Sequence, residues 1–349
     1  MVRNLLIRVI LLLALCVIFA CKAKETPPDQ ITEQITELEH EKEEKPSQED
    51  QSAITESDDV QTSYQIQRSL SDIRAGLSGA LPAFGVNISE ISPANYENSD
   101  PAVLRRMGMD QYLISFFAGE QFYKSGDYDR ALAEYTASIN SNGEFIEALI
   151  SRGNAWLKKG EYSRAIDDYT RSIRLDSGRA ELYNYRGYAR YERREINLAI
   201  EDYSRAISLN SNYADALINR SHALYEIGEY DRAIEDCSRI IALEPGNAYI
   251  WNRRGSAWYR KEDDDRAIRD FTEAIRLKGD YALAWHNRGN AWYNKGEYDR
   301  ALADLNRTLA INPSFASAYI SRGNILRILG NYESAEADFE TARQLENRH

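Results

Sequence analysis

The chain has 349 residues, with 55 acidic and 43 basic side chains and a formal net charge of −12. Three cysteines and four histidines are too few for a disulfide framework or a histidine-rich metal site. The acidic balance argues against a nucleic-acid-binding protein, because nucleic acid attracts basic surfaces.

Residues 1–21 have the pattern of an export signal. Two arginines in the first eight residues precede an apolar run over residues 9–20, and Cys21 follows. The run is shorter than the ~20 residues of a membrane-spanning helix, and the pattern is typical of a secretory signal peptide. Residues 18–21 resemble a bacterial lipobox, although Phe19 departs from the usual small residue. We expect cleavage before Cys21 and lipidation of its thiol; the alternative is an uncleaved anchor.

Residues 22–62 are predicted to form a disordered acidic linker, because Glu, Asp, Gln, Lys, Ser and Thr dominate them. Residues 22–100 hold 17 acidic and 6 basic side chains, a net charge of −11. Residues 101–349 have a net charge of only −3. The acidity therefore belongs to the linker, which we expect to hold the rest of the chain away from the lipid.

Residues 63–111 are predicted to be a partly helical cap region. Ile66, Leu70, Ile73 and Leu77 have helical spacing. We expect one or two helices here to cover the front of the region that follows. The alternative is that a helix over 63–77 lies in a binding groove as a displaceable pseudo-ligand.

From Tyr112 to His349 the sequence repeats every 34 residues without an insertion or deletion. One slot holds glycine in six of seven units: Gly119, Gly153, Gly187, Ser221, Gly255, Gly289 and Gly323. Twelve residues later every unit has alanine, and four residues further on most units have a large apolar residue. A period of this size is typical of a stacked repeat array.

Each unit contains two runs of apolar and small residues at helical spacing, separated by a turn with a residue such as Gly160. The unit is therefore predicted to be a helix-turn-helix, which buries its apolar face only against its neighbours. Two units nearly match the signature W-x2-L-G-x2-Y followed by A-x3-F, one through Trp285, Gly289, Trp292 and Ala301 and the other through Trp251, Gly255, Trp258, Ala267 and Phe271. On these residues the array closely resembles the tetratricopeptide repeat (TPR) family.

The resemblance implies an all-α fold, a right-handed superhelical solenoid with one concave and one convex surface. It implies seven repeats, over residues 112–145, 146–179, 180–213, 214–247, 248–281, 282–315 and 316–349. In the last repeat, two slots that are apolar in the other six become Glu336 and Arg343. Such a polar outer face is typical of a terminal capping repeat.

One departure from the family pattern concerns charge. Six units have arginine before the glycine slot: Arg152, Arg186, Arg220, Arg254, Arg288 and Arg322. The same units have aspartate sixteen residues later: Asp168, Asp202, Asp236, Asp270, Asp304 and Asp338. The first unit lacks both, so we predict an ion pair within each unit. A phosphate-binding ladder is the alternative, but a guanidinium held by a carboxylate is already satisfied.

The sequence predicts no catalytic, metal or cofactor site. No G-x-S-x-G, H-E-x-x-H, C-x-x-C or phosphate-cradling loop occurs. His222 and His286 stand two units apart, about 20 Å, which is too far to share a metal. Cys237 occupies a core slot and is expected to be an inert packed thiol.

The concave groove is predicted to be lined by the second, fifth, ninth, twelfth and thirteenth residues of each unit. The candidates for peptide binding are Glu181, Asn184, Tyr188, Tyr191, Glu192, Asp215, His222, Tyr225, Glu226, Tyr249, Asn252, Tyr259, His286, Asn290 and Tyr293. Tyrosines among amides suit an extended peptide or a helix, although these residue types are ordinary in the family. Four carboxylates in units three and four, without Lys or Arg at the same slots, favour a basic partner.

These features together predict a membrane-anchored scaffold that binds protein or peptide partners through its groove. We expect it on the exported side of a bacterial membrane, in the assembly or localisation of an envelope complex. One alternative is a structural spacer without a dedicated ligand. Another is an enzyme with its site in residues 63–111, a segment without His or Cys.

Overall fold

The computed structural model describes residues 104–105 and 108–346. The export signal with Cys21, the linker over 22–62 and most of the region 63–111 lie outside this range. The helix expected over 63–77 lies outside it as well.

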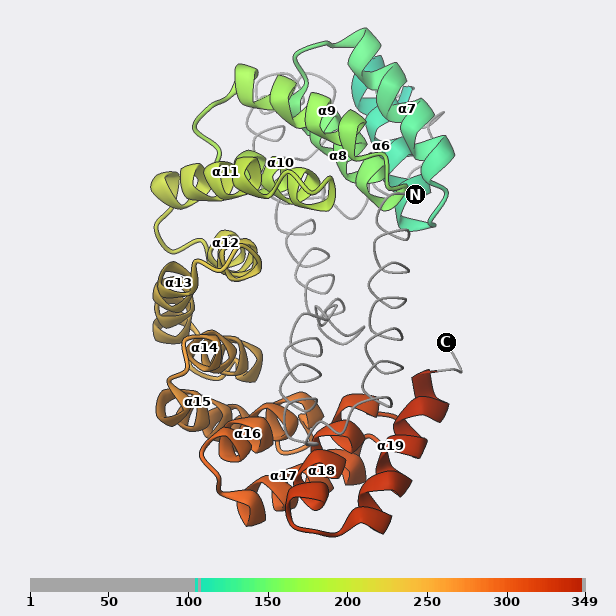
Figure 1. Ribbon diagram of the computed structural model, residues 1–349. Helices are drawn as coiled ribbons and strands as arrows, with labels where there is room; N and C mark the ends of the chain where they lie inside the picture. The colour runs from blue at the N-terminus through green and yellow to red at the C-terminus, as the bar shows by residue number, and fades with distance from the viewer. Residues whose placement is uncertain (1–103, 106–107, 347–349) are drawn as a thin grey trace, which may run out of the picture. The chain divides into compact units, whose positions relative to one another are not determined.

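The described residues form fourteen α-helices, α6 to α19, and contain no strand (Figure 1). The first helices of the seven units are α6 (Gln111–Lys124), α8 (Ile146–Lys158), α10 (Ala180–Glu192), α12 (Ala214–Glu226), α14 (Ala248–Arg260), α16 (Ala282–Asn294) and α18 (Ala316–Ile328). The second helices are α7 (Tyr128–Ser141), α9 (Tyr162–Leu175), α11 (Ile196–Leu209), α13 (Tyr230–Leu243), α15 (Asp264–Leu277), α17 (Tyr298–Ile311) and α19 (Tyr332–Glu346). The predicted all-α array of helix pairs is confirmed. None of the described helices combines the length and apolar character that crossing a membrane requires.

Consecutive helices pack side by side along the whole array (Figure 1). The second helix of each unit therefore packs both on its own first helix and on the first helix of the next unit. First helices also contact one another across units, as α10 contacts α12 and α14 contacts α16, whereas second helices do so much less. The first helices thus form the inner layer.

The core is continuous from one unit to the next. Ala199 and Tyr203 on α11, Ala223 and Leu224 on α12, and Ala233 on α13 form one buried cluster. Their exposed fractions are 0–1%. Because each helix pair buries its apolar face only against its neighbours, stability propagates from unit to unit.

Each glycine in a first helix allows close approach of a large side chain from the second helix. A Cβ atom on Gly187 would lie 2.7 Å from Cε1 of Tyr203. In unit six a Cβ atom on Gly289 would lie 3.2 Å from Cγ of the smaller Leu305. Where serine replaces glycine, at Ser221, the facing residue is the small Cys237. The two slots vary together because they fill one volume.

The turn inside each unit requires a backbone in the left-handed region. Glycine provides it in five units, with φ of +74° at Gly160 and +80° at Gly228. In units three and five the same slot holds Arg194 (φ 65°) and Glu262 (φ 61°). A side chain in this conformation costs about 1–2 kcal/mol. The side chain of Arg194 forms an ion pair of 2.5 Å with Glu226 of the next unit, which offsets part of that cost.

Gly187→Ala should destabilise the array, because the added methyl group would overlap the buried ring of Tyr203. We expect a loss of about 1–3 kcal/mol, the usual range for overpacking a core. Gly289→Ala is the matched control, because its methyl group meets Leu305 at 3.2 Å and alanine favours a helix by about 1 kcal/mol over glycine. Urea unfolding followed by circular dichroism compares the variants. Equal losses in both would contradict the steric explanation.

Candidate functional site

The candidate groove residues lie on α10, α12, α14 and α16, the first helices of units three to six. We call the surface formed by the first helices the first-helix face. A column of tyrosines runs along it at the twelfth slot of four consecutive units: Tyr191, Tyr225, Tyr259 and Tyr293. All four are half-buried. Tyr188 and Tyr249 lie on the same face, also half-buried.

Two of the four column tyrosines are braced from the side by a second tyrosine of the same unit. The rings of Tyr225 and Tyr230 lie 5.4 Å apart, edge to face, and those of Tyr293 and Tyr298 lie 5.9 Å apart. Such pairs stabilise an aromatic side chain in one orientation. The ring positions of Tyr225 and Tyr293 are therefore fixed by contacts within their own units.

Three of the predicted groove residues are buried between helices. Asn184, Asn252 and His286 are 3–5% exposed. Asn184 accepts a hydrogen bond of 3.0 Å from Asn219 of the next unit, and Asn252 accepts one of 3.2 Å from Asn287. The fifth slot thus joins adjacent first helices and presents little surface to a ligand.

The sequence prediction missed the sixth slot, which holds Asn219, Arg253 and Asn287. Arg253 donates from Nε and Nη2 to the hydroxyl of Tyr249, at 3.1 and 2.5 Å. Helical spacing contained the signal, because the sixth slot lies four residues after the second slot and three before the ninth. The sixth slot therefore lies on the same helix face as the second and ninth slots, and the predicted set of groove residues should have included it.

Of the two ninth-slot residues, His222 contacts a neighbouring helix and Asn290 contacts a residue of its own helix α16. The ring of His222 lies 5.3 Å from that of Tyr191 on α10. Burial, assisted by the nearby positive charge of Arg253, holds the pKa of His222 well below its usual range. Asn290 Nδ2 lies 3.3 Å from Nε2 of His286.

The four groove carboxylates are less free than the sequence indicated. Glu181 pairs with Arg179 at 2.8 Å. Glu226 pairs with Arg194 and also accepts a hydrogen bond of 2.6 Å from the hydroxyl of Tyr191. These arginines stand outside the groove slots, in the connections before α10 and α11, so a search of the slots alone could not find them.

The other two carboxylates are half-buried. Glu192 lies beside Tyr162 of the preceding unit, whose pKa is raised by burial and by this negative charge. Asp215 begins the first turn of α12, where an acidic side chain is favoured by the helix dipole. Part of the acidity of this face therefore serves the stacking of the units.

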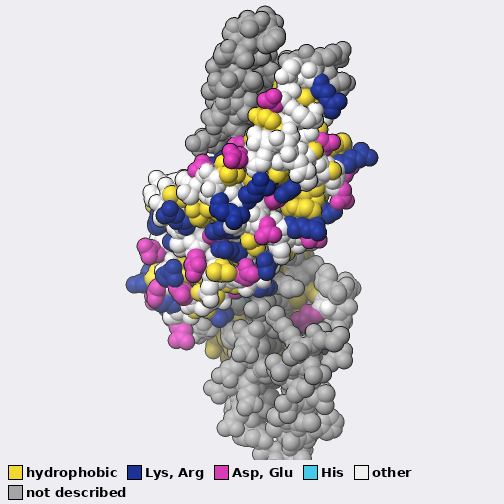
Figure 2. Space-filling model, turned by 90° about the horizontal axis from the view of Figure 1, so that it is seen from above, with side chains coloured by type: hydrophobic (Ala, Val, Ile, Leu, Met, Phe, Trp, Pro, Cys, Tyr) yellow, Lys and Arg dark blue, Asp and Glu magenta, His cyan; other side chains and the backbone are white. Residues whose placement is uncertain are grey.

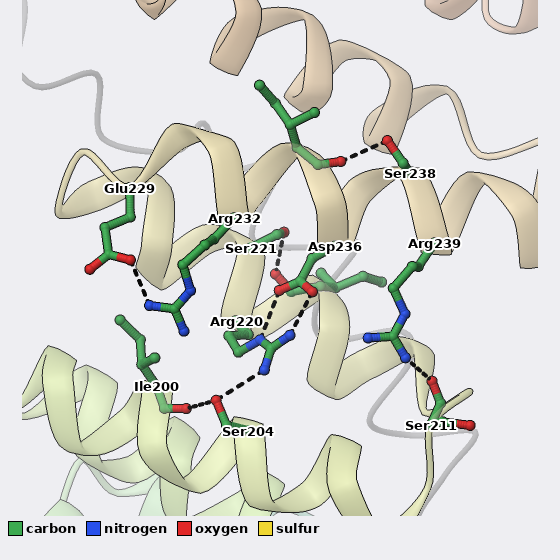
Figure 3. A network of polar contacts seen from close by, with 12 residues as sticks. Ile200, Ser204, Ser211, Arg220, Ser221, Glu229, Arg232, Asp236, Ser238 and Arg239 are labelled. Carbon is green, nitrogen blue, oxygen red and sulfur yellow. Dashed lines mark hydrogen bonds and ion pairs between the residues drawn. The ribbon is translucent and has the colours of Figure 1, made fainter.

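The arginine slot forms a three-way junction, as Arg220 shows (Figure 3). Its Nε and Nη2 donate to the two carboxylate oxygens of Asp236, at 2.8 and 2.7 Å. Its Nη1 donates to Oγ of Ser204, at 3.0 Å, on the second helix of the preceding unit. Ser204 in turn donates to the carbonyl of Ile200, at 2.6 Å. One guanidinium therefore holds α11, α12 and α13 together.

The same junction occurs at all six arginines, so the predicted pairing within each unit is confirmed. The aspartates are buried, with exposed fractions of 1–6%. The acceptors on the preceding units are Thr136, Thr170, Ser204, Ser238, Thr272 and Asn306. The sequence analysis did not predict this third partner, although a residue with a side-chain oxygen stands sixteen positions before every one of these arginines. With these guanidinium nitrogens engaged, the arginines are structural and form no ladder for phosphate.

No group of three or more His, Cys, Asp or Glu side chains within the described residues is arranged to hold a metal ion. Cys237 is fully buried, and burial raises the pKa of its thiol to about 11. The thiol therefore stays protonated at neutral pH, as a packed residue rather than a nucleophile. On the face shown in Figure 2, Lys and Arg side chains are interspersed with Asp and Glu.

Comparison with known proteins agrees with the fold and with the repeat pattern. Family profiles described as tetratricopeptide repeats match residues 118–180, 184–248, 219–282, 282–315 and 316–349. The chain belongs to the tetratricopeptide repeat family. No curated protein matches the chain significantly.

Solved structures of TPR proteins are similar to this array. One, from Parabacteroides merdae, is 19% identical with a TM-score of 0.55 and covers 67% of this chain and 93% of its own. The C-terminal part of a TPR protein from Cytophaga hutchinsonii is 14% identical with a TM-score of 0.57, covering 67% of this chain and 96% of its own. A crystal structure of MamA is 28% identical with a TM-score of 0.47, covering 50% of this chain and 94% of that one. The first two show the TPR fold alone.

Arg220→Ala should destabilise the middle of the TPR array by roughly 1–3 kcal/mol, because the buried Asp236 loses its guanidinium. In a double-mutant cycle, Arg220 should couple to Asp236 and not to Asp202, which pairs with Arg186. Urea unfolding of the single and double alanine variants measures both couplings. A coupling to Asp202 as large as that to Asp236 would contradict the junction described above.

Proposed function

We propose that this TPR protein is a membrane-anchored scaffold that binds protein or peptide partners on its first-helix face and has no catalytic activity of its own. The tyrosine column of Tyr191, Tyr225, Tyr259 and Tyr293 is the observation that supports this most. Four half-buried rings at one slot of four consecutive units form a regular strip of apolar contact. Tyrosine gives such contact at low entropic cost and adds a hydroxyl group.

Amide side chains beside the column support binding of a peptide rather than of a purely apolar ligand. Asn287 donates to Asn252 and to Ser256 of the preceding unit, at 3.2 and 3.5 Å, whereas Asn219 donates to Asn184 of the preceding unit, at 3.0 Å. A side-chain amide has two donor hydrogens and an acceptor oxygen, so one such bond, as at Asn219, leaves further capacity. That capacity matches the alternating donors and acceptors of an extended peptide backbone.

A basic partner would gain less electrostatic attraction on this face than four unpaired carboxylates would provide. Glu181 and Glu226 are engaged with arginines, which reduces the attraction that these two carboxylates offer to a basic partner. We therefore propose that tyrosine contacts provide most of the affinity and that charge sets a modest preference for basic sequences. Binding should then weaken only slightly as salt rises from low to physiological concentration, because few exposed charges take part.

Anchoring is proposed from the sequence of the export signal, with Cys21 as the acylated residue. The acidic linker after it would let the array reach partners at a distance from the lipid. We therefore propose the exported side of a bacterial membrane as the location of the array. A tethered scaffold suits the assembly or localisation of an envelope complex.

Changing Tyr225, Tyr259 and Tyr293 together to alanine should reduce at least tenfold the recovery of partners cross-linked in detergent-solubilised envelope. Loss of a single central aromatic contact commonly costs about 2 kcal/mol, more than a tenfold change in affinity. Quantitative mass spectrometry after affinity capture measures the recovery.

Leu198→Ala is the matched control, because Leu198 is 41% exposed and lies on the second helix α11. Circular dichroism establishes that both variants keep their helices. Undiminished recovery with the tyrosine variant would move the binding surface away from the first-helix face. The absence of any specific partner with the wild type would indicate a spacer.

Cys21→Ala should prevent acylation, so that the protein accumulates as an uncleaved precursor or leaves the membrane fraction. Cys16→Ala is the matched control, since Cys16 lies inside the apolar run and would be removed with the signal. Metabolic labelling with a fatty acid, followed by fractionation, tests both. Labelling and membrane association of Cys21→Ala at the level of the wild type would overturn the lipid anchor.

A further inference from the structure

The junction between units six and seven contains a buried histidine. His286 on α16 is 3% exposed, and its ring centroid lies 4.9 Å from that of Phe315. Nε2 of His286 lies 3.4 Å from Oγ of Ser321 on α18 and 3.3 Å from Nδ2 of Asn290. Nδ1 is buried without a hydrogen-bond partner. A titratable ring thus contacts both units while one of its nitrogens is unsatisfied.

The equivalent junction between units five and six is neutral and better satisfied. There Asn252 occupies the slot of His286 and Tyr281 the slot of Phe315. Asn252 donates to the hydroxyl of Tyr281 at 3.5 Å and accepts from Asn287 at 3.2 Å. A similar contact joins Asn184 and Tyr213, at 3.4 Å. At the last junction, an imidazole packed against a phenyl ring stands where these two other junctions have a contact between an amide and a hydroxyl group.

The last junction, like those between units two and three and between units three and four, lacks a lysine–aspartate ion pair that the other three junctions have. Lys295 of unit six pairs with Asp265 of unit five at 2.5 Å, and the corresponding pairs Lys159–Asp129 and Lys261–Asp231 join two other junctions. At the junction of units six and seven the same slots hold Leu329 and Asp299, and Leu329 is 51% exposed. The three-way contact of Arg322 with Asp338 and Asn306 is kept. Unit seven is therefore docked with fewer polar contacts than its neighbours.

The groups that shift the pKa of His286 are neutral. Burial lowers its pKa to about 4, opposed by the neutral polar groups of Asn287 and of the Ser317 backbone. Among the described residues, no charged side chain of α14, α15, α17 or α18 contributes to this shift. On α18, Arg322 is engaged with Asp338, and the guanidinium of Arg327 lies over the ring of Phe339. A proton on His286 would therefore be a buried positive charge without a carboxylate to balance it.

We propose that the junction between units six and seven is an acid-sensitive joint, at which protonation of His286 releases α18 and α19. Repeat arrays can open in this way because each unit contacts only its neighbours. The proposal goes beyond the binding function and does not depend on it.

The direction of the pH effect follows from the two states of the ring. Docked His286 stays neutral down to a pKa of about 4, whereas the undocked ring has an ordinary pKa of about 6.5. Docking is therefore fully stable above pH 6.5 and loses stability as the pH falls from 6.5 towards 4. At pH 5 linkage predicts about 30-fold more of the undocked state than at pH 7.5.

Hydrogen exchange of the full-length protein, read by mass spectrometry at pH 7.5 and 5.0 and corrected for intrinsic rates, tests the proposal. In the wild type, opening of α18 and α19 should increase about 30-fold at pH 5.0. The matched variant combines His286→Asn with Phe315→Tyr, which recreates the pair found at Asn252 and Tyr281. In this variant the opening should change less than about threefold. His222→Asn, on α12, should leave the response of α18 and α19 as in the wild type.

An equal response of α18 and α19 in the wild type and the double variant would overturn the proposal, as would the absence of a response in the wild type. Should the double variant fail to fold, carbon-13 NMR of the wild-type histidines decides. Opening of α18 and α19 must then follow the protonation of His286. An imidazole that titrates near pH 6.5 while α18 and α19 stay protected would overturn the joint.

Discussion

A buried guanidinium that contacts three helices at once is the interaction on which the array depends. Arg220 and its five equivalents bond a carboxylate of their own unit and an oxygen of the preceding one. The bidentate geometry fixes distance and rotation between the helices more narrowly than apolar contact does. Because the aspartates are 1–6% exposed, losing the arginine would leave a buried charge. This requirement explains why the arginine and the aspartate occur together and why the first unit lacks both.

The stacking of the units uses many of the polar groups that face the first-helix side. The fifth and sixth slots bond each other across units, and the thirteenth reaches the twelfth of the preceding unit, as Glu226 reaches Tyr191. What these bonds leave for a partner is mainly ring surface and spare amide capacity. The first-helix face therefore serves both the stacking of the units and the proposed binding of a partner. The tyrosines differ in which of these two roles their contacts support. Tyr191 is tied to the next unit, whereas Tyr225 and Tyr293 are braced within their own units.

The junctions between units are not equivalent. Some carry a lysine–aspartate pair, two carry an asparagine–tyrosine contact, and the last carries His286 against Phe315. Substitutions at contacting slots occur together, as Ser221 does with Cys237, because neighbouring side chains fill one space. The stability of such an array is a sum of local terms, so different junctions can respond differently to pH or to a partner.

The period of 34 residues and the recurring glycine and alanine slots were enough to predict helix pairs. The joint occurrence of arginine and aspartate was enough to predict the pairing of each arginine with its aspartate. These features depend on contacts within one unit or between adjacent units, which recur at fixed spacing along the chain. The tyrosine column followed from the same spacing. Only the tertiary structure showed that Arg179 and Arg194 neutralise Glu181 and Glu226, that Asn184, Asn252 and His286 are buried, and that Ser204 and its equivalents complete the arginine junction. Those outcomes depend on where long side chains from turns and neighbouring units end, and a long side chain can reach several partners from one backbone position.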